Sequence, residues 1–292
     1  IHAPTYKDYL LLILLSAIWG SAFVAIEFSV STMPPFIIAF GRIFLASLFL
    51  LFFVFIKKLS FPKDMKTWRM LIIIGVLNTA APFYLISWGQ QYISAGTASV
   101  MLAVGPFVAL LISHFLTNDE KFTIFKLIGV ILGFIGVFIL LGDDFLHGNQ
   151  NSLYGKIAML FAVSGYIVSG FLIRKVSHVP TLVCSSSMFI TASILMFPFL
   201  FFTPLHNVEI LSYPFLAIIY LAIVPTAAAS LIRINLVQQV GVQFMSQVAY
   251  LIPMFAIFWA WVFFDDTPKQ IIIITLILIL SGLFIRNIKW KS

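Results

Sequence analysis

The sequence predicts an all-α integral membrane protein of ten transmembrane helices, arranged as two inverted five-helix repeats with both termini cytoplasmic. Three observations lead to this fold class. The 292 residues are 62% hydrophobic and only 9% charged, whereas a soluble domain carries about 25% charged residues. Long apolar runs follow one another with short connectors, and the two halves of the chain share local sequence. Positive charge is concentrated in alternate connectors.

Each apolar run is long enough for one membrane crossing. About 20 apolar residues in helical form cross a bilayer, because every backbone polar group must be satisfied within the span. The first run is too long for the core of a signal peptide, so we expect it to remain as a span. The runs cover residues 9–30, 35–56, 69–89, 95–116, 124–141, 153–174, 181–202, 214–236, 242–264 and 270–288.

Lysine and arginine residues predict the orientation of these spans. Connectors rich in lysine and arginine stay on the cytoplasmic side of a membrane. With the N-terminus inside, thirteen of these residues are cytoplasmic, and only Lys156 and Lys269 lie outside. Both termini are then cytoplasmic, which requires an even number of spans. The net charge of +7 does not indicate binding to nucleic acid, because the basic residues are spread through short connectors and form no basic groove.

Residues 147 positions apart are alike in the two halves. Pro106 in GPFVALLISHFLTNDE corresponds to Pro253 in IPMFAIFWAWVFFDDT, and the Thr-Ala-Ala sequence at 79–81 recurs at 226–228. Because each half has an odd number of spans, the second half is inverted relative to the first. Inverted repeats are a transporter architecture with the substrate site near the membrane midplane. The expected parts are a first repeat over 1–141, an outer linker over 142–152 and a second repeat over 153–292.

Several motifs resemble the EamA type of the drug/metabolite transporter superfamily. They are WGSAF from Trp19, FGRIFLAS around Arg42, QYISAGTASVM leading to Gly105, and KLIGVILGFIGVFIL from Lys126. Their order and spacing cover nearly the whole chain. The resemblance implies a transporter, and members similar to this sequence move amino acids, other metabolites or drugs.

The candidate ionisable residues inside the predicted spans, where a charge costs about 2.5 to 3.5 kcal/mol, are Glu27, Arg42, His114 and Arg233. His114 lies near the cytoplasmic end, where an interfacial histidine without a transport role is expected. Glu27 and Arg42 flank the first outer turn symmetrically, so we expect them at similar depth as an ion pair with a coupling or structural role. Arg233 shares a helical face with Thr226 and Ser230. If Arg233 faces a cavity, its charge suits a carboxylate, and the alternative is that it snorkels to the inner headgroups.

Polar and aromatic side chains on the expected inner faces predict the substrate cavity. Such a lining suits a small amphipathic ligand. Plain packing or anchoring at the membrane interface is the alternative for the aromatic residues. The predicted substrate-binding residues are Trp19, Phe23, Asn78, Tyr84, Trp88, Ser164, Tyr166, Ser230, Arg233, Gln247 and Tyr250.

Four prolines lie within spans that correspond between the halves. Each proline removes a backbone hydrogen bond from its helix and kinks it. Kinks in matched helices suit gates that rock or bend, so we predict gating hinges, with static kinks as the alternative. The four residues are Pro82, Pro106, Pro225 and Pro253.

No motif indicates an enzyme. The sequence has no HExxH motif, no phosphate loop and no clustered histidine or cysteine ligands, so we expect no catalytic residue, no cofactor and no metal. The lone Cys184 cannot form an intrachain disulfide bond. Without a nucleotide-binding motif, a gradient must drive any active transport.

These observations together predict a secondary transporter of the plasma membrane, here the bacterial inner membrane. It would move small amphipathic, amino-acid-like metabolites by alternating access, with export favoured. Uptake by exchange is one alternative, and a channel or a membrane-embedded enzyme is another. The expected partners are a small-molecule substrate and the lipid bilayer, while the oligomeric state stays open.

Overall fold

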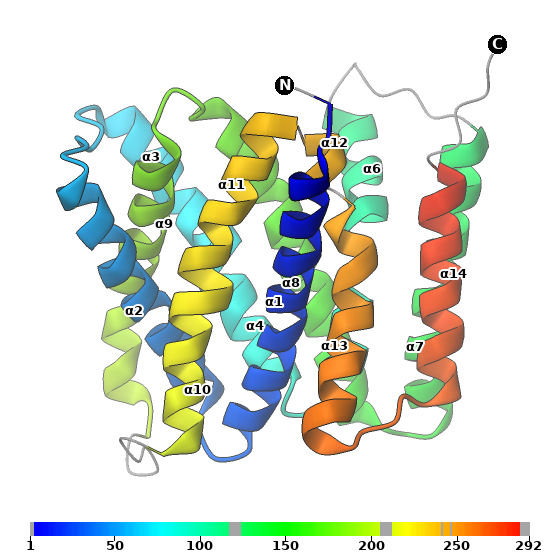
Figure 1. Cartoon of the computed structure of the whole chain (residues 1–292). Helices are drawn as coiled ribbons and strands as arrows, with labels where there is room; N and C mark the ends of the chain where they lie inside the picture. Colours follow the sequence, from blue (N-terminus) through cyan, green and yellow to red (C-terminus); the bar gives the residue numbers. More distant parts are fainter. Residues whose placement is uncertain (1–2, 117–123, 205–211, 241, 246, 287–292) are drawn as a thin grey trace.

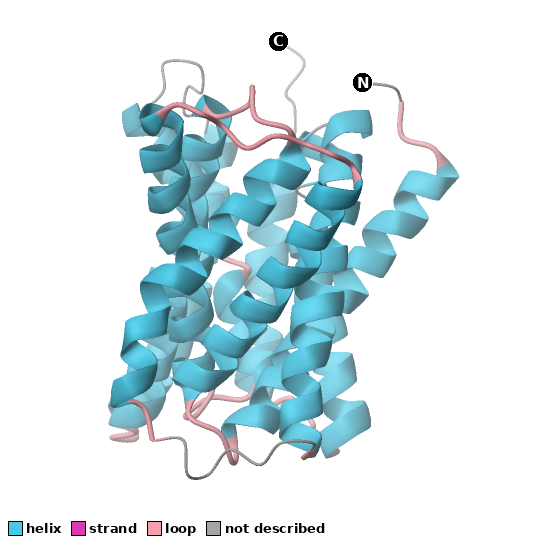
Figure 2. Cartoon of the chain, turned by 90° about the vertical axis from the view of Figure 1, so that its left-hand side faces the viewer, coloured by secondary structure: helices cyan, strands magenta, loops and turns pink. Residues whose placement is uncertain are grey.

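The structure, a computed structural model, is a bundle of helices (Figure 1). It describes residues 3–116, 124–204, 212–240, 242–245 and 247–286, and no strand occurs among them. Most loops lie at the two ends of the bundle (Figure 2). Helices satisfy their own backbone hydrogen bonds, which is the requirement for a chain that crosses a bilayer.

Seven helical segments are long and apolar enough to cross a membrane. Three shorter apolar segments, Ala95–Leu110, Val248–Phe264 and Gln270–Ile285, accompany them. All ten segments coincide with apolar runs of the sequence. The seven long segments are Tyr6–Val30, Pro35–Ile56, Met65–Gly89, Leu127–Leu146, Gln150–Ile173, Thr181–Phe202 and Tyr213–Arg233.

Several of these segments are interrupted by a break or by a change of helix type. The elements in chain order are α1 (Tyr6–Val30), α2 (Pro35–Ile56), α3 (Met65–Gly75), η1 (Val76–Ala80), α4 (Ala81–Gly89), α5 (Ala95–Leu102), α6 (Gly105–Leu116), α7 (Ile124–Leu146), α8 (Gln150–Lys175), α9 (Thr181–Met196), η2 (Phe197–Phe202), α10 (Tyr213–Leu221), η3 (Ala222–Ala228), α11 (Ala229–Val240), α12 (Val242–Met245), α13 (Val248–Phe264) and α14 (Gln270–Arg286).

The bundle has two distinct ends. Helix α1 begins and α14 ends at the upper end in Figure 1, which we call the terminal end. The opposite end, which we call the turn end, holds the turn between α1 and α2. The two halves of the chain interleave, because α1 packs on α13, α2 on α9, α4 on α8 and α7 on α14.

The connector between the halves is shorter than the expected linker over 142–152. Helix α7 continues to Leu146 and α8 begins at Gln150. A buried ion pair joins the two helices, with Lys156 Nζ 2.7 Å from Asp144 Oδ2. The same ammonium donates a hydrogen bond of 2.8 Å to the carbonyl of Leu140. Asp144 lies within the linker predicted over 142–152, and the structure places it in the last turn of α7.

Glycines permit close crossings between helices of the two halves. At the crossing of α4 and α8, a Cβ atom on Gly155 would lie 2.9 Å from the carbonyl oxygen of Gly89. Such a distance is shorter than real Cβ contacts, and a backbone atom cannot move away as a side chain does. This crossing therefore requires glycine at position 155.

Gly155→Leu is expected to destabilise the bundle, whereas Gly170→Leu on the same helix is expected to be neutral. No atom lies within 4 Å of a Cβ at Gly170. Overpacking of a tight contact costs about 1 to 3 kcal/mol, and both variants have the same helix propensity. Melting temperatures in detergent check this, and equal values for the two variants would contradict the close crossing.

Candidate functional site

Two π-helical segments mark matched positions near the middle of the bundle. They are η1 and η3, which interrupt the third and eighth apolar segments at the 147-residue spacing of the repeat. π-helical turns are rare and occur frequently at functional sites. Thr79 in η1 and Thr226 in η3 are the repeated threonines of the sequence. These segments locate the candidate site.

Arg42 of α2 lies directly against η3. Its Nε donates a hydrogen bond of 2.5 Å to Thr226 Oγ1, and its guanidinium carbon lies 3.9 Å from the centre of the Phe83 ring. The side chain is only 7% exposed. Among the described residues no carboxylate pairs with it. A hydroxyl and an aromatic face stabilise a cation only in part, so the terminal nitrogens remain able to bind an anionic ligand.

Two further side chains complete a cluster around Arg42. Tyr166 of α8 is half-buried and packs against the apolar cluster that contains Phe83, the ring beside Arg42. Arg233 lies on α11, which runs from η3 toward the terminal end. Its side chain is exposed in the structure. We call Arg42, Tyr166 and Arg233 the arginine cluster.

A polar contact fixes α8 beside η1 and thereby positions Tyr166. Ser169 Oγ is hydrogen-bonded to Asn78 Oδ1 at 2.9 Å and to the backbone carbonyl of Tyr166 at 2.8 Å. A Cβ on Gly165 would lie 2.7 Å from the carbonyl oxygen of Leu77. The predicted residues Asn78 and Tyr166 therefore belong to one region, with Asn78 in the supporting contact.

The predicted ion pair between Glu27 and Arg42 is not formed. Both residues are described, and each has another partner. The backbone N–H of Ala95, the first residue of α5, donates a hydrogen bond of 2.5 Å to Glu27 Oε2, while Arg42 bonds Thr226. The symmetric spacing about the turn predicts similar depth but not the facing direction. Glu27 points to the start of α5, where backbone N–H groups favour an anion.

The stability effects of Glu27→Gln and Arg42→Gln are therefore expected to add. Residues without shared partners show additive effects within about 0.5 kcal/mol, whereas a buried ion pair makes one single variant worse than the double variant. Unfolding free energies of both single variants and the double variant check this. A double variant that is more stable than either single variant would instead support an ion pair between Glu27 and Arg42.

Two predicted residues of α1 have structural contacts next to the cluster. Trp19 Nε1 donates a hydrogen bond of 3.1 Å to the carbonyl of Pro225 in η3. Phe23 is buried in the main core, and its carbonyl accepts a hydrogen bond of 2.8 Å from Gln90 Nε2. Trp19 thus lies beside the site, while Phe23 packs in the core.

The predicted aromatic residues of α4 contact rings outside the cluster. Tyr84 makes an edge-to-face contact with Phe36 at 6.2 Å between ring centres, and Trp88 makes one with Tyr92 at 5.2 Å. Phe83, between Pro82 and Tyr84, is the residue of α4 that contacts Arg42. The sequence analysis missed Phe83, because a phenylalanine in an apolar helix carries no polar signal.

The two predicted serines are satisfied within their own helices. Ser164 Oγ donates a hydrogen bond of 2.8 Å to the carbonyl of Leu160, and Ser230 Oγ donates one to the carbonyl of Thr226. A serine that bonds the carbonyl one turn earlier keeps an acceptor lone pair but has used its only proton. In this conformation both can accept a hydrogen bond from a ligand and cannot donate one.

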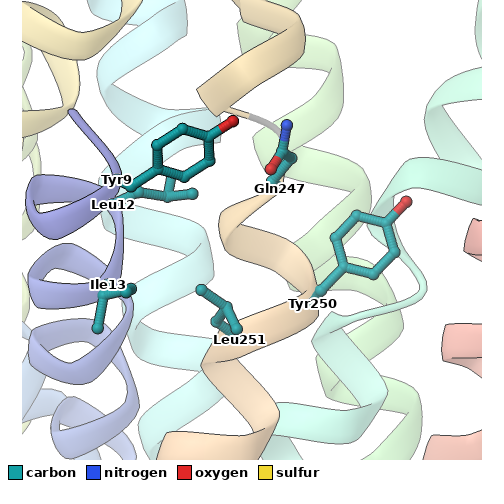
Figure 3. A pocket seen from close by; sticks show the side chains of 6 residues that line it. All are labelled: Tyr9, Leu12, Ile13, Gln247, Tyr250 and Leu251. Atoms are coloured by element: carbon teal, nitrogen blue, oxygen red, sulfur yellow. The ribbon is translucent and has the colours of Figure 1, made fainter. Parts of the chain in front are cut away.

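Gln247 and Tyr250 lie in a different place, a pocket between α1 and α13 (Figure 3). Its volume is about 450 Å³. Tyr250 Oη donates a hydrogen bond of 3.2 Å to the carbonyl of Leu283 on α14. The structure therefore divides the expected single cavity, since none of the cluster residues lines this pocket. Its lining residues are Tyr9, Leu12, Ile13, Gln247, Tyr250 and Leu251.

Three of the four predicted hinge prolines adjoin changes in helix geometry. Pro82 follows η1 at the start of α4, and Pro225 lies within η3. Pro106 follows the break at residues 103–104 between α5 and α6. Pro253 lies inside the uninterrupted α13. Their role as gating hinges stays a prediction.

The described residues contain no group of three or more histidine, cysteine or acidic side chains that could hold a metal ion. The chemistry of the site is that of a fixed positive charge, a phenol and an aromatic wall inside apolar helices. Such a site can bind and orient an anionic solute.

The fold, a bundle of long apolar helices, is that of a multi-pass membrane protein. The model of the EamA-like transporter family matches residues 7–142 and again residues 152–288, so the chain belongs to that family. Family membership indicates a transporter rather than an enzyme. It also makes the chain a multi-pass protein of the bacterial membrane.

Relatives agree with this family, and one solved structure shares the fold. The uncharacterized transporter YoaV of Bacillus subtilis (strain 168) is 24% identical over 96% of this chain and 97% of its own length. A probable amino-acid metabolite efflux pump of Escherichia coli (strain K12) is 25% identical over 98% and 97%. One crystal structure, with 18% identity and a TM-score of 0.69, covers 96% of this chain and 97% of its own and has the same fold.

Proposed function

We propose that this protein is a secondary transporter that moves small amphipathic, amino-acid-like metabolites across the inner membrane by alternating access, with export favoured. One observation carries the proposal. The arginine cluster places one buried cation, Arg42, and one exposed cation, Arg233, beside η3 in an apolar bundle. An interior charge is costly and needs a functional reason. The carboxylate of an amino-acid-like compound provides that reason, because guanidinium groups match carboxylates in charge and geometry.

The proposal includes ten spans in two inverted halves, with both termini cytoplasmic. The two matches of the family model support two halves, over residues 1–141 and 153–292. The seven long and three shorter apolar helices support ten spans. The shared terminal end of α1 and α14 supports an even number of crossings.

This orientation predicts which sites react with a membrane-impermeant thiol reagent added outside the cell. Cys184 is removed first, and single cysteines replace the exposed residues Lys63 and His147. The terminal end is cytoplasmic if position 147 reacts in intact cells and position 63 reacts only after lysis. Reaction at position 63 with none at position 147 would show the opposite orientation in the membrane.

Contacts at the turn end support access from the cytoplasm. There α1 is bonded to the neighbouring α4 and α5, through Gln90 to the carbonyl of Phe23 and through the Ala95 N–H to Glu27. Toward the terminal end, Arg233 keeps exposed surface. In the proposed orientation, access from the terminal end would let the protein load its substrate from the cytoplasm, as an exporter requires.

Flux in proteoliposomes tests the proposal. Purified protein is reconstituted and loaded with radiolabelled amino acids and their metabolites, one per sample, and efflux is compared with protein-free vesicles. Saturable efflux of at least one compound supports transport. Dependence on a solute on the opposite side would favour uptake by exchange, and non-saturable ion conductance would favour a channel. No flux of any compound, under any imposed gradient, would reject the proposal.

A further inference from the structure

The pocket between α1 and α13 (Figure 3) shares no lining residue with the arginine cluster. Its volume of about 450 Å³ lies in the range of about 300 to 1,000 Å³ that is typical of small-molecule sites. Among the described residues that line it, none is aspartate, glutamate, lysine, arginine or histidine. The pocket is therefore a separate site, and its chemistry is uncharged.

The lining is polar at one end and apolar at the other. Figure 3 shows Tyr9 and Gln247 at one end of the pocket, with Ile13 and Leu251 at the other. Both α1 and α13 run from the terminal end toward the turn end (Figure 1), so the polar end is the one nearer the terminal end. Such a lining matches a solute with a polar head and a hydrocarbon tail.

The polar end offers hydrogen bonds that the described part of the protein does not use. The Tyr9 ring makes an edge-to-face contact with Phe244 at 5.0 Å between ring centres, which holds the phenol in place. No described residue pairs with the Tyr9 hydroxyl or the Gln247 amide, whereas the Tyr250 hydroxyl bonds the carbonyl of Leu283. A phenol and an amide each donate and accept hydrogen bonds, so together they match an uncharged head group that does both.

We infer that this pocket binds a short, uncharged amphiphile from the bilayer, with a hydroxyl or carboxamide head at Tyr9 and Gln247. Its hydrocarbon tail would lie against Leu12, Ile13 and Leu251. A charged head would exchange its hydration for two uncharged partners, which is costly away from water. The site is therefore expected to select against ions of the same chain length.

The surroundings of the pocket place its opening on the surface that faces lipid. Ile13 is 45% exposed, and the next residue, Leu14, is 48% exposed. On α13, Met254 and Phe258 follow Leu251 by three and seven residues, which continues one helical face, and they are 52% and 46% exposed. Exposed apolar side chains on a membrane-spanning bundle contact lipid, so a solute dissolved in the bilayer can reach the pocket directly.

A close crossing of the two helices limits the length of the tail. A Cβ atom on Gly20 would lie 2.7 Å from the Cβ of Phe255, and Trp259 Nε1 donates a hydrogen bond of 3.1 Å to the carbonyl of Ala17. From Tyr9 to Ala17 the helix rises by about 12 Å. The pocket therefore suits a short chain better than the full acyl chain of a phospholipid.

Photolabelling of the purified protein in lipid nanodiscs tests the inference. The probe is 1-octanol that carries a diazirine on its chain, and mass spectrometry locates the labelled residues. Saturable labelling is expected within residues 9–13 and 247–251. Unlabelled 1-octanol should compete at membrane concentrations about tenfold lower than octanoate or octylammonium, because a charged head loses hydration in the pocket. Empty nanodiscs give the membrane concentration of each competitor.

Two tryptophan variants on adjacent residues separate the pocket from general contact with lipid. Ile13→Trp fills the pocket and should lower labelling at both segments about tenfold, since the added ring takes the place of the tail. Leu14→Trp adds the same ring at an exposed position outside the lining and should keep wild-type labelling. Gln247→Leu keeps the volume but removes the amide, so competition by 1-octanol should weaken about two- to tenfold. Melting temperatures check that each variant folds.

Labelling that does not saturate, or that is equally strong at exposed lipid-facing residues such as Ile273 and Ile277 of α14, would overturn the inference and show an ordinary lipid contact. Equal competition by octanoate or octylammonium would also overturn it, as would full labelling of a folded Ile13→Trp variant. The labelling requires no transport, so its outcome and the outcome of the flux panel are independent. Saturation and competition in the wild-type protein decide the inference even where a variant fails to fold.

Discussion

Arg42→Lys is expected to lower transport about 10- to 100-fold, although the positive charge is retained. A lysine ammonium cannot bond Thr226, stack on Phe83 and offer a two-nitrogen edge to a ligand at the same time. Arginine and lysine are not interchangeable where a planar group is held on several sides. Loss of one charged hydrogen bond, at about 1.5 to 3 kcal/mol, accounts for an effect of this size.

The measurement is initial flux per reconstituted protein, with melting temperature recorded in parallel. Arg69→Lys serves as the matched control, because Arg69 is exposed on α3 and distant in sequence from the cluster contacts. Thr226→Val should also reduce flux, since it leaves Arg42 Nε without its acceptor. Wild-type flux in Arg42→Lys would show that Arg42 provides charge alone or lies outside the substrate path.

The membrane class and the apolar runs were predictable because they depend on composition and length. A run such as residues 35–56 has one stable arrangement in a bilayer, and the structure gives α2 those same bounds. The positions where these helices are interrupted were harder to predict from the sequence. Pro225 indicated a disturbed helix, but no motif in either segment indicated the π-helical turns of η1 and η3.

The candidate site was predictable only in part, for a geometric reason. Helical spacing placed Arg233 and Thr226 on one span, which the structure forms as η3 followed by α11, but it does not say which helix faces that span. Arg42 was therefore given to Glu27, its neighbour across the turn, whereas the folded chain brings it to Thr226, 184 positions away. Gln247 and Tyr250 were placed in the same cavity for the same reason, and they line a separate pocket with α1.

The other large expected effect concerns the ion pair between α7 and α8. Lys156→Met should lower the free energy of unfolding by about 3 to 5 kcal/mol, because it leaves the Asp144 carboxylate buried without a partner. Both side chains are only 6% exposed, and their charged atoms are 2.7 Å apart. The double change Lys156→Met with Asp144→Leu should recover most of the loss, since well-packed apolar side chains replace a buried pair at little cost.

Denaturant unfolding in a constant mixed-micelle system measures both variants, and Lys269→Met is the control. Lys269 lies before α14 and is exposed, so its removal should change the unfolding free energy by less than about 0.5 kcal/mol. The recovery in the double variant distinguishes an ion pair from simple packing. If the double variant is as unstable as Lys156→Met alone, the hydrogen bond from Lys156 to the Leu140 carbonyl, rather than the charge of Asp144, is what holds α8 against α7.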